Sequence, residues 1–316
     1  MRGSIRILQT LVIVVTLLLI SSAARGDERS LPVSSSSRSF SSSNTCSPAI
    51  SVEGQAQQGE PTIRETFRRF FPESEEIFRS ILPWNWNSPA AAIGLGAAVV
   101  PLVVWKDDIQ AWVDRNEGDD LRFAEGEAIF SRFEELGGRW FVPALSGAFA
   151  IGGLATGSQR EVETGLMIVQ SYLFTAAVTG IGQYILAEDR PYKGGELNFF
   201  RMDGHGVSGH SALSASFVRP LDARYLSIGS DDGRALRVVK TIGKGALYTA
   251  PVMVAVSRVR SNRHYVWNVV LGVAVGYSVG RVVSEVHEKA RAEAVQETVA
   301  DGMPLASQFL SFSWRW

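Results

Sequence analysis

The amino-acid sequence predicts an all-α fold, a bundle of helices, and two observations support this prediction. Apolar stretches of helical length recur along the chain, and most of them are rich in glycine and alanine, which lets helices pack closely. Strand signals, in which apolar and polar residues alternate, are sparse. Residues 61–316 are numerous enough to form one domain with a full core, and we expect them to do so.

Two N-terminal segments are expected to lie outside this domain. Residues 1–26 look like a secretory signal peptide, because Arg2 and Arg6 precede an apolar run and small residues follow it. The alternative is an uncleaved membrane anchor. Residues 27–60 form a Ser-rich tether whose composition cannot bury enough apolar surface to fold. The expected location is therefore outside the cytoplasm, in the periplasm or cell envelope.

The expected helices follow one another from residue 62 to residue 283. Thr62–Leu82 is amphipathic, and Asp119–Leu136 is a charged amphipathic helix of the surface. The apolar helices are expected at Ala90–Trp105, Phe141–Thr156, Leu166–Ala187, Ala246–Val256 and Val266–Val283.

The C-terminus departs from the helical pattern. Large apolar residues alternate with polar ones from Leu310 to Trp316, which predicts a short strand-like tail packed on the domain. The alternative interpretation of this aromatic ending is an outer-membrane signal.

The sequence favours a bundle that is soluble or membrane-associated over a full set of membrane spans. A spanning helix needs about 20 apolar residues, and several of the apolar stretches are shorter. The segment after His210 soon meets Arg219 and Asp222, and the mean hydropathy of the chain is only +0.07. A membrane surface is therefore an expected partner.

Charge and cysteine content exclude some other classes of function. The formal net charge is −1, which argues against a protein that binds nucleic acid by simple electrostatic attraction. Cys46 is the only cysteine, so the chain has neither an intrachain disulfide nor a cysteine-based metal cluster.

Three of the four histidines lie in two short stretches, 188–210 and 257–268, which also carry arginines. Arginine side chains bind oxyanions through paired N–H groups, and the free N–H groups at a helix start form a second anion seat. One imidazole can then attack a phosphorus atom while another donates a proton. Ser208 is expected to cap such a helix start, where Gly209 lets an anion approach the backbone.

Three blocks carry this chemistry. They read Gln183-x(6)-Arg190-Pro191, then Val207-Ser208-Gly209-His210, then Ser257-Arg258-x(5)-His264-x(3)-Asn268. In order and internal spacing they resemble the type 2 phosphatidic acid phosphatase and vanadium haloperoxidase superfamily, whose pattern is K-x(6)-R-P, P-S-G-H and S-R-x(5)-H-x(3)-D. The resemblance covers about residues 88–283 and implies the helical bundle of that superfamily.

The resemblance also implies a role for each residue. His264 is the nucleophile that becomes phosphohistidine, and His210 is the general acid that protonates the leaving oxygen. The expected phosphate-binding residues are Gln183, Arg190, Ser208, Gly209 and Arg258. No metal or other cofactor is expected, apart from vanadate if the chain is a haloperoxidase.

Two departures from the superfamily pattern affect the expected rate. Gln183 replaces the lysine, so one phosphate-binding charge is missing. Asn268 replaces the aspartate that would orient the nucleophile. His264 and Asn268 are expected on one helix face, where the Asn268 carbonyl oxygen accepts the ring N–H of His264 without offsetting its positive charge. On this interpretation, Asn268→Asp raises turnover.

The expected function is an exported, metal-independent phosphatase. Its substrate is a phosphate monoester or pyrophosphate, of a small molecule or, as the sequence favours, of a lipid. One alternative is a catalytically impaired relative that binds a phosphorylated ligand, and a second is a vanadate-dependent haloperoxidase.

Overall fold

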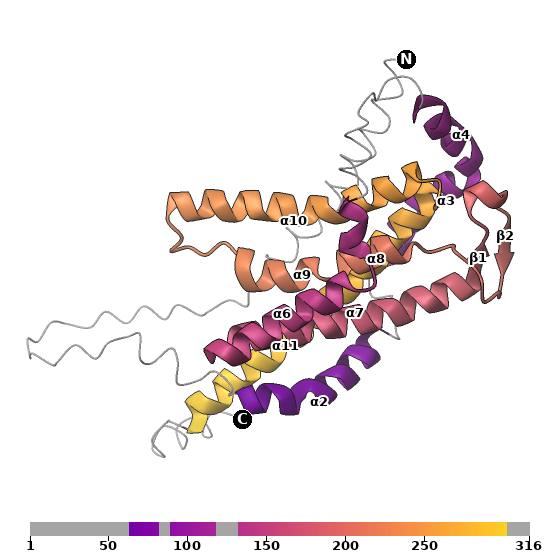
Figure 1. The fold of residues 1–316 in the computed structure, drawn as a ribbon. Helices are drawn as coiled ribbons and strands as arrows, with labels where there is room; N and C mark the ends of the chain where they lie inside the picture. Colours follow the sequence, from indigo (N-terminus) through magenta and orange to yellow (C-terminus); the bar gives the residue numbers. More distant parts are fainter. Residues whose placement is uncertain (1–62, 82–88, 118–131, 302–316) are drawn as a thin grey trace, which may run out of the picture. The chain divides into compact units, whose positions relative to one another are not determined.

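The computed structural model describes residues 63–81, 89–117 and 132–301, and these residues are mostly helical (Figure 1). The predicted all-α fold is confirmed. Residues Thr62–Ala290 form one compact unit. The predicted signal peptide, Ser-rich tether and C-terminal strand-like tail lie outside the described residues.

The first half of the described chain contains four long or medium helices. They are α2 (Ile63–Ile81), α3 (Pro89–Val104), α4 (Lys106–Glu117) and α6 (Phe141–Thr156). Before α6, a 3-10 helix, η2, spans Glu135–Gly137. The helix predicted at Asp119–Leu136 is therefore not continuous to its predicted end, and residues 119–131 lie outside the described residues.

The second half carries the three sequence blocks. It contains α7 (Gln159–Ile185), β1 (Leu186–Glu188), η3 (Pro191–Lys193), β2 (Leu197–Phe199), α8 (Gly209–Ser216), α9 (Val218–Leu221), the π-helix η4 (Asp222–Leu226), α10 (Arg234–Arg260) and α11 (Val266–Asp301). The sequence predicted only the apolar second half of α10, because charged residues interrupt the apolar pattern of its first half.

Small residues hold α6 against α7, as the sequence predicted for its apolar helices. A Cβ atom on Gly165 would lie 2.8 Å from Ser146 O and from Ala150 N, so the two backbones pack closely there. Ser146 Oγ also donates to Gly165 O at 2.8 Å. Val142, Ile168 and Phe217 form a buried apolar cluster that joins this helix pair to the residue between α8 and α9.

A row of glycines on α11 receives the backbone of α8. Gly272, Gly276 and Gly280 are four residues apart and therefore lie on one helix face. A Cβ atom on any of them would collide with a carbonyl oxygen, namely that of Ser208, Ala212 or Ser216 respectively. We call these three residues the glycine row. The glycine row packs α8, which carries the end of the second sequence block, directly against α11, the helix that begins within the third block.

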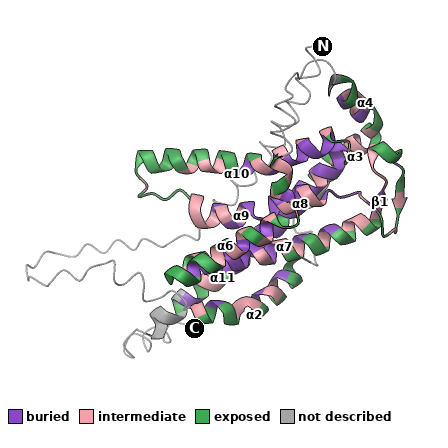
Figure 2. Cartoon of the chain, viewed as in Figure 1, coloured by how far each residue is buried: buried purple, intermediate pink, exposed green. Residues whose placement is uncertain are grey.

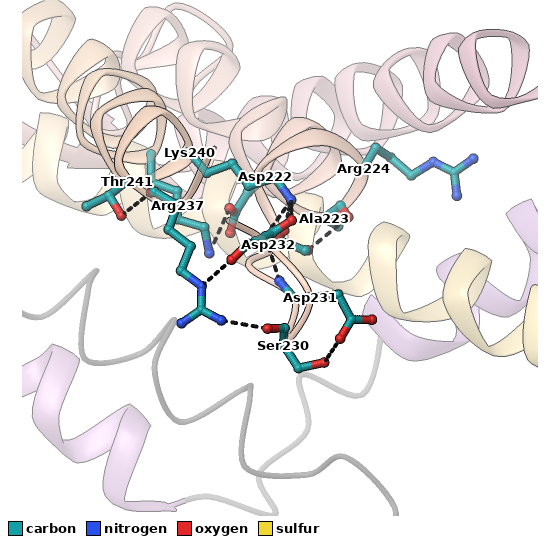
Figure 3. Close-up of polar contacts among 12 residues, drawn as sticks. Asp222, Ala223, Arg224, Ser230, Asp231, Asp232, Arg237, Lys240 and Thr241 are labelled. Atoms are coloured by element: carbon teal, nitrogen blue, oxygen red, sulfur yellow. Dashed lines mark hydrogen bonds and ion pairs between the residues drawn. The ribbon is translucent and has the colours of Figure 1, made fainter. Parts of the chain in front are cut away.

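The first half of α10 is largely exposed, whereas its second half is buried (Figure 2). A polar turn precedes the exposed half. Lys240 Nζ lies 2.8 Å from Asp232 Oδ2, and Arg237 donates to Asp232 O at 2.9 Å and to Ser230 O at 2.6 Å (Figure 3). These contacts tie the turn to the helix that ends at the third block.

A short hairpin follows α7, and the sequence did not predict it. Strands β1 and β2 pair antiparallel, with Leu186 opposite Phe199 and Glu188 opposite Leu197. Because α7 ends at Ile185, Arg190 lies outside the helix that carries Gln183. Arg190 instead has extended backbone dihedrals just before η3.

Among the residues that the structure describes, two helices are long and apolar enough to cross a membrane by length and composition, Gln159–Ile185 and Val266–Ala294. The most apolar windows of these helices are 44% and 61% buried within the protein. The core helices of soluble proteins pass the same test, so this finding is weak support for membrane association.

Candidate active site

His264 lies in the short segment between α10 and α11, and its side chain is only 5% exposed. Its backbone N–H donates to Arg258 O at 3.2 Å, and its ring meets the ring of His205 edge-on at 6.4 Å between centroids. Burial lowers the pKa of His264 to about 3, and the positive charges of Arg258, His205, Arg190 and His210 add to this effect. The imidazole is therefore neutral at pH 7, and charged residues from all three blocks lower its pKa.

His210 is the second residue of α8, in the turn that the glycine row holds in place. Burial lowers the pKa of His210 below its usual value. The charges of Arg258 and Arg190 add to this decrease, and the carboxylate of Glu134 opposes it.

Three buried nitrogens of this site have no hydrogen-bond partner among the described residues. They are Nε of Arg190, Nε of Arg258 and Nδ1 of His264. Both arginines are instead held at Nη1, by Tyr192 Oη at 3.4 Å and by Glu134 Oε2 at 3.1 Å. Unpaired buried polar atoms cost free energy, and a phosphate oxygen is the kind of acceptor that guanidinium N–H groups bind well. The two guanidinium nitrogens, one from the first block and one from the third, thus fit an anion.

Gln183 contacts the turn before α8, and Ser208 lies at the end of that turn. Gln183 Nε2 donates to Val207 O at 2.8 Å, so the amide supports the turn. Ser208 occupies the N-cap position of α8, as predicted, but its side chain makes no capping hydrogen bond. Its hydroxyl is fully buried and accepts a hydrogen bond from Ser211 Oγ at 3.0 Å. The N–H groups of this helix start are then left to other acceptors.

Asn268 does not orient His264 as the sequence suggested, and that part of the prediction is wrong. The Asn268 carbonyl oxygen accepts from the backbone N–H of Tyr265 at 2.7 Å. Its Nδ2 donates to Glu188 Oε2 at 2.9 Å and to Gly206 O at 2.8 Å. The physical reason is that α11 begins at Val266, so His264 precedes the helix and shares no helix face with Asn268.

Asn268 instead joins the three blocks. Besides the contacts with Tyr265, Glu188 and Gly206, its backbone carbonyl accepts from Ser208 N–H at 3.1 Å. An amide suits this place because it can accept one hydrogen bond and donate two, whereas a carboxylate can only accept.

Glu188 and Lys106 form a buried ion pair behind this amide. The carboxylate of Glu188 is 1% exposed and lies 2.7 Å from Lys106 Nζ. Burial raises the pKa of Glu188, and the hydrogen bonds from Lys106 and Asn268 oppose that increase. Lys106 also donates to Gly195 O and lies 4.7 Å from the ring centroid of Tyr265. The first residue of α4 is therefore tied to the hairpin and to the third block.

The sequence did not single out Lys106 or Glu134. Each makes its contact across a long stretch of chain, 82 residues from Lys106 to Glu188 and 124 from Glu134 to Arg258. Neither residue stands in a recognisable motif, so the sequence held no signal for them.

A comparison with family models identifies the region that carries the three blocks. The model of the PAP2 superfamily matches residues 165–292. Residues 165–292 belong to the PAP2 superfamily. No curated protein and no solved structure matches the chain. The PAP2 region contains all eight predicted site residues, whereas Lys106 and Glu134 lie before it.

The part of the chain that the structure describes contains no evident metal-binding site. No group of three or more His, Cys, Asp and Glu side chains is placed there to hold a metal ion. The metal-independent reaction expected from the sequence stays a prediction.

Proposed function

We propose that this PAP2 protein is a phosphatase that hydrolyses a phosphate monoester or a pyrophosphate through a phosphohistidine on His264. One observation carries the proposal: the Nε atoms of Arg190 and Arg258 and Nδ1 of His264 are buried without a partner among the described residues. Membership of the PAP2 superfamily supports a phosphatase-related function in general.

The first half of the reaction transfers the phosphoryl group to His264. The lone pair of its neutral ring forms the N–P bond while the bond from phosphorus to the leaving oxygen breaks. Arg190 and Arg258 bind the equatorial phosphoryl oxygens and stabilise the charge that they carry. His210 donates its proton to the leaving oxygen. The low pKa of His264 favours this step, because it keeps the nucleophilic lone pair free.

The second half returns the enzyme to its starting state. His210, now neutral, takes a proton from a water molecule whose oxygen attacks phosphorus. The N–P bond breaks, its electron pair returns to the His264 ring, and inorganic phosphate leaves.

A lipid phosphate outside the cytoplasm is the proposed substrate. The predicted signal peptide and the two long apolar helices support this part of the proposal. Strand β2 and the residue after it also expose Leu197, Phe199 and Phe200, which suit contact with acyl chains or a membrane surface.

A binding protein without turnover is the second candidate, and one specific observation favours it. Gln183 brings no charge to the site, and its amide is engaged with Val207 O. A haloperoxidase, the third candidate, would bind vanadate with the same unpaired nitrogens.

The test is the turnover of para-nitrophenyl phosphate by the purified protein in a chelating buffer. We expect phosphate release that vanadate inhibits and that His264→Ala abolishes. Since the pKa of His210 lies below 6.5, its protonated fraction falls as the pH approaches neutrality, whereas His264 stays neutral above about pH 3. The rate constant kcat/KM should therefore be highest at acidic pH and fall toward pH 7.

The other outcomes separate the three candidates. Stabilisation by vanadate without any turnover would favour the binding protein. Bromide oxidation that requires vanadate and peroxide would favour the haloperoxidase. If vanadate neither inhibits nor stabilises the protein, the proposed phosphate site is refuted.

A further inference from the structure

A carboxylate from outside the PAP2 region lies against the proposed phosphate site. Glu134 Oε2 accepts from Arg258 Nη1 at 3.1 Å. Its other oxygen, Oε1, accepts from Ser257 Oγ at 2.9 Å and from Ser261 Oγ at 3.4 Å. All three donors stand at the end of α10, so Glu134 is bound to the third block by both of its oxygens.

The backbone next to Glu134 is fixed against the second block. A Cβ atom on Gly137 would lie 2.7 Å from the carbonyl carbon of His210 and 2.9 Å from its Cα. Only glycine permits this contact between η2 and α8. Glu134 precedes Gly137 by three residues, so its carboxylate has a defined place beside both His210 and Arg258.

The ion pair with Glu134 occupies only one side of the Arg258 guanidinium group. In a guanidinium group, Nε and Nη2 point along the same edge, and Nη1 lies on the other side. Glu134 binds Nη1, while Nε is buried without a partner among the described residues. The Nε edge can therefore bind phosphoryl oxygens while the ion pair with Glu134 persists.

The charges around the site are otherwise mostly positive. Arg190 and Arg263 act electrostatically on Arg258, and Arg190 and Arg258 act on His210. A phosphate site with uncompensated arginines would bind its product, inorganic phosphate, tightly and release it slowly.

We propose that Glu134 is the internal counter-ion of the phosphate site: it holds Arg258 with the Nε edge free, and its negative charge weakens phosphate binding so that the product leaves. This inference rests on the proposed function and deepens it. Glu134 touches no reacting atom in this scheme, so it is a positioning and charge-balancing residue.

The same charge acts on the general acid. The groups that face His210 are Arg258 from α10, Arg190 from the segment before η3, and Glu134. Glu134 alone among these three favours the protonated imidazole. Its loss should lower the pKa of His210 further and leave less of the acid protonated at a given pH.

The test compares Glu134→Gln with the matched control Glu135→Gln in the full chain. Both variants remove one negative charge, but Glu135 is exposed, and its carboxylate does not pair with Arg258. We expect Glu134→Gln to lower the Kd for vanadate, and the inhibition constant for phosphate, by about tenfold, which is the scale of one nearby charge. The fall of kcat/KM with rising pH should begin at lower pH. Glu135→Gln should change neither quantity.

A purely structural role for Glu134 would change the Kd for vanadate in the opposite direction. If the carboxylate only supports the fold, Glu134→Gln weakens vanadate binding, lowers the melting temperature and leaves the pH profile unshifted, and the inference is then wrong. A wild type that binds no vanadate refutes the proposed function instead.

Discussion

At the scale of single residues, Asn268 shows why a departure from a family pattern can be fitted to its surroundings. The aspartate of the superfamily pattern would meet an acceptor at both positions where Asn268 Nδ2 now donates, the Glu188 carboxylate and Gly206 O. From these contacts we expect the opposite of the effect that the sequence predicted for Asn268→Asp.

We predict that Asn268→Asp destabilises the protein by about 2–4 kcal/mol, since it buries a second carboxylate beside Glu188 and leaves Gly206 O unpaired. Chemical denaturation at pH 7 measures the loss, and turnover should fall rather than rise. The double variant Glu188→Gln with Asn268→Asp should recover part of the stability, because the amide introduced at position 188 then donates to the new carboxylate. A gain in turnover from Asn268→Asp alone would support the original interpretation of the sequence.

The sequence could predict that the block residues lie near one another, but it could not predict contacts between distant stretches of the chain. Four of the predicted residues stand in blocks of fixed spacing: Arg190, His210, Arg258 and His264. In the structure, Arg190, His210 and Arg258 are close enough to His264 for their charges to lower its pKa. The use of the Asn268 amide could not be predicted, because it depends on Glu188, which lies 80 residues away.

At the scale of secondary-structure elements, apolar patterns located helices well where both faces are apolar. The predicted range Phe141–Thr156 is the observed range of α6. The first half of α10 was missed because its charged residues face solvent, and the hairpin was missed because three-residue strands are too short for alternation to show. Because the hairpin begins directly after α7, Arg190 lies outside the helix.

The glycine row of α11 gives a prediction at this scale. Gly276→Ala should cost about 1–3 kcal/mol, because the added Cβ meets the carbonyl oxygen of Ala212 and pushes α8 away. Vanadate binding should weaken with it. Gly180→Ala on α7 is the control: a Cβ there meets nothing within 4 Å, so this change should be neutral or stabilise by up to about 1 kcal/mol. Equal effects of the two changes would rule out the packing argument.

At the scale of the whole molecule, the PAP2 region depends on residues that precede it. Lys106 pairs with buried Glu188, and Glu134 pairs with Arg258. Family comparison locates the three blocks, but the charges that surround them come partly from another stretch of the chain. Electrostatic balance of the site is thus a property of the compact unit Thr62–Ala290.

Lys106→Met tests this dependence. It leaves the Glu188 carboxylate buried without its cation, and we expect a loss of about 3–5 kcal/mol at pH 7. The pKa of Glu188 in the folded state, already raised by burial, rises further in this variant. Stability is then retained below the unfolded value of about 4.5 and lost as the pH rises through the folded value. Denaturation curves at pH 4.5 and pH 7 should show a smaller deficit at the lower pH, and an equal deficit at both would contradict this account.

The glycine row also limits how the length of this chain can change during evolution. Asn268, Gly272, Gly276 and Gly280 follow one another at intervals of four residues on α11. One inserted residue would turn everything beyond it by about 100° around the helix axis. Glycines beyond the insertion would then face away from α8, and side chains would meet its carbonyl oxygens. Exposed positions of α11 such as Ser278 can accept substitutions, but the stretch from Asn268 to Gly280 should admit neither insertions nor deletions.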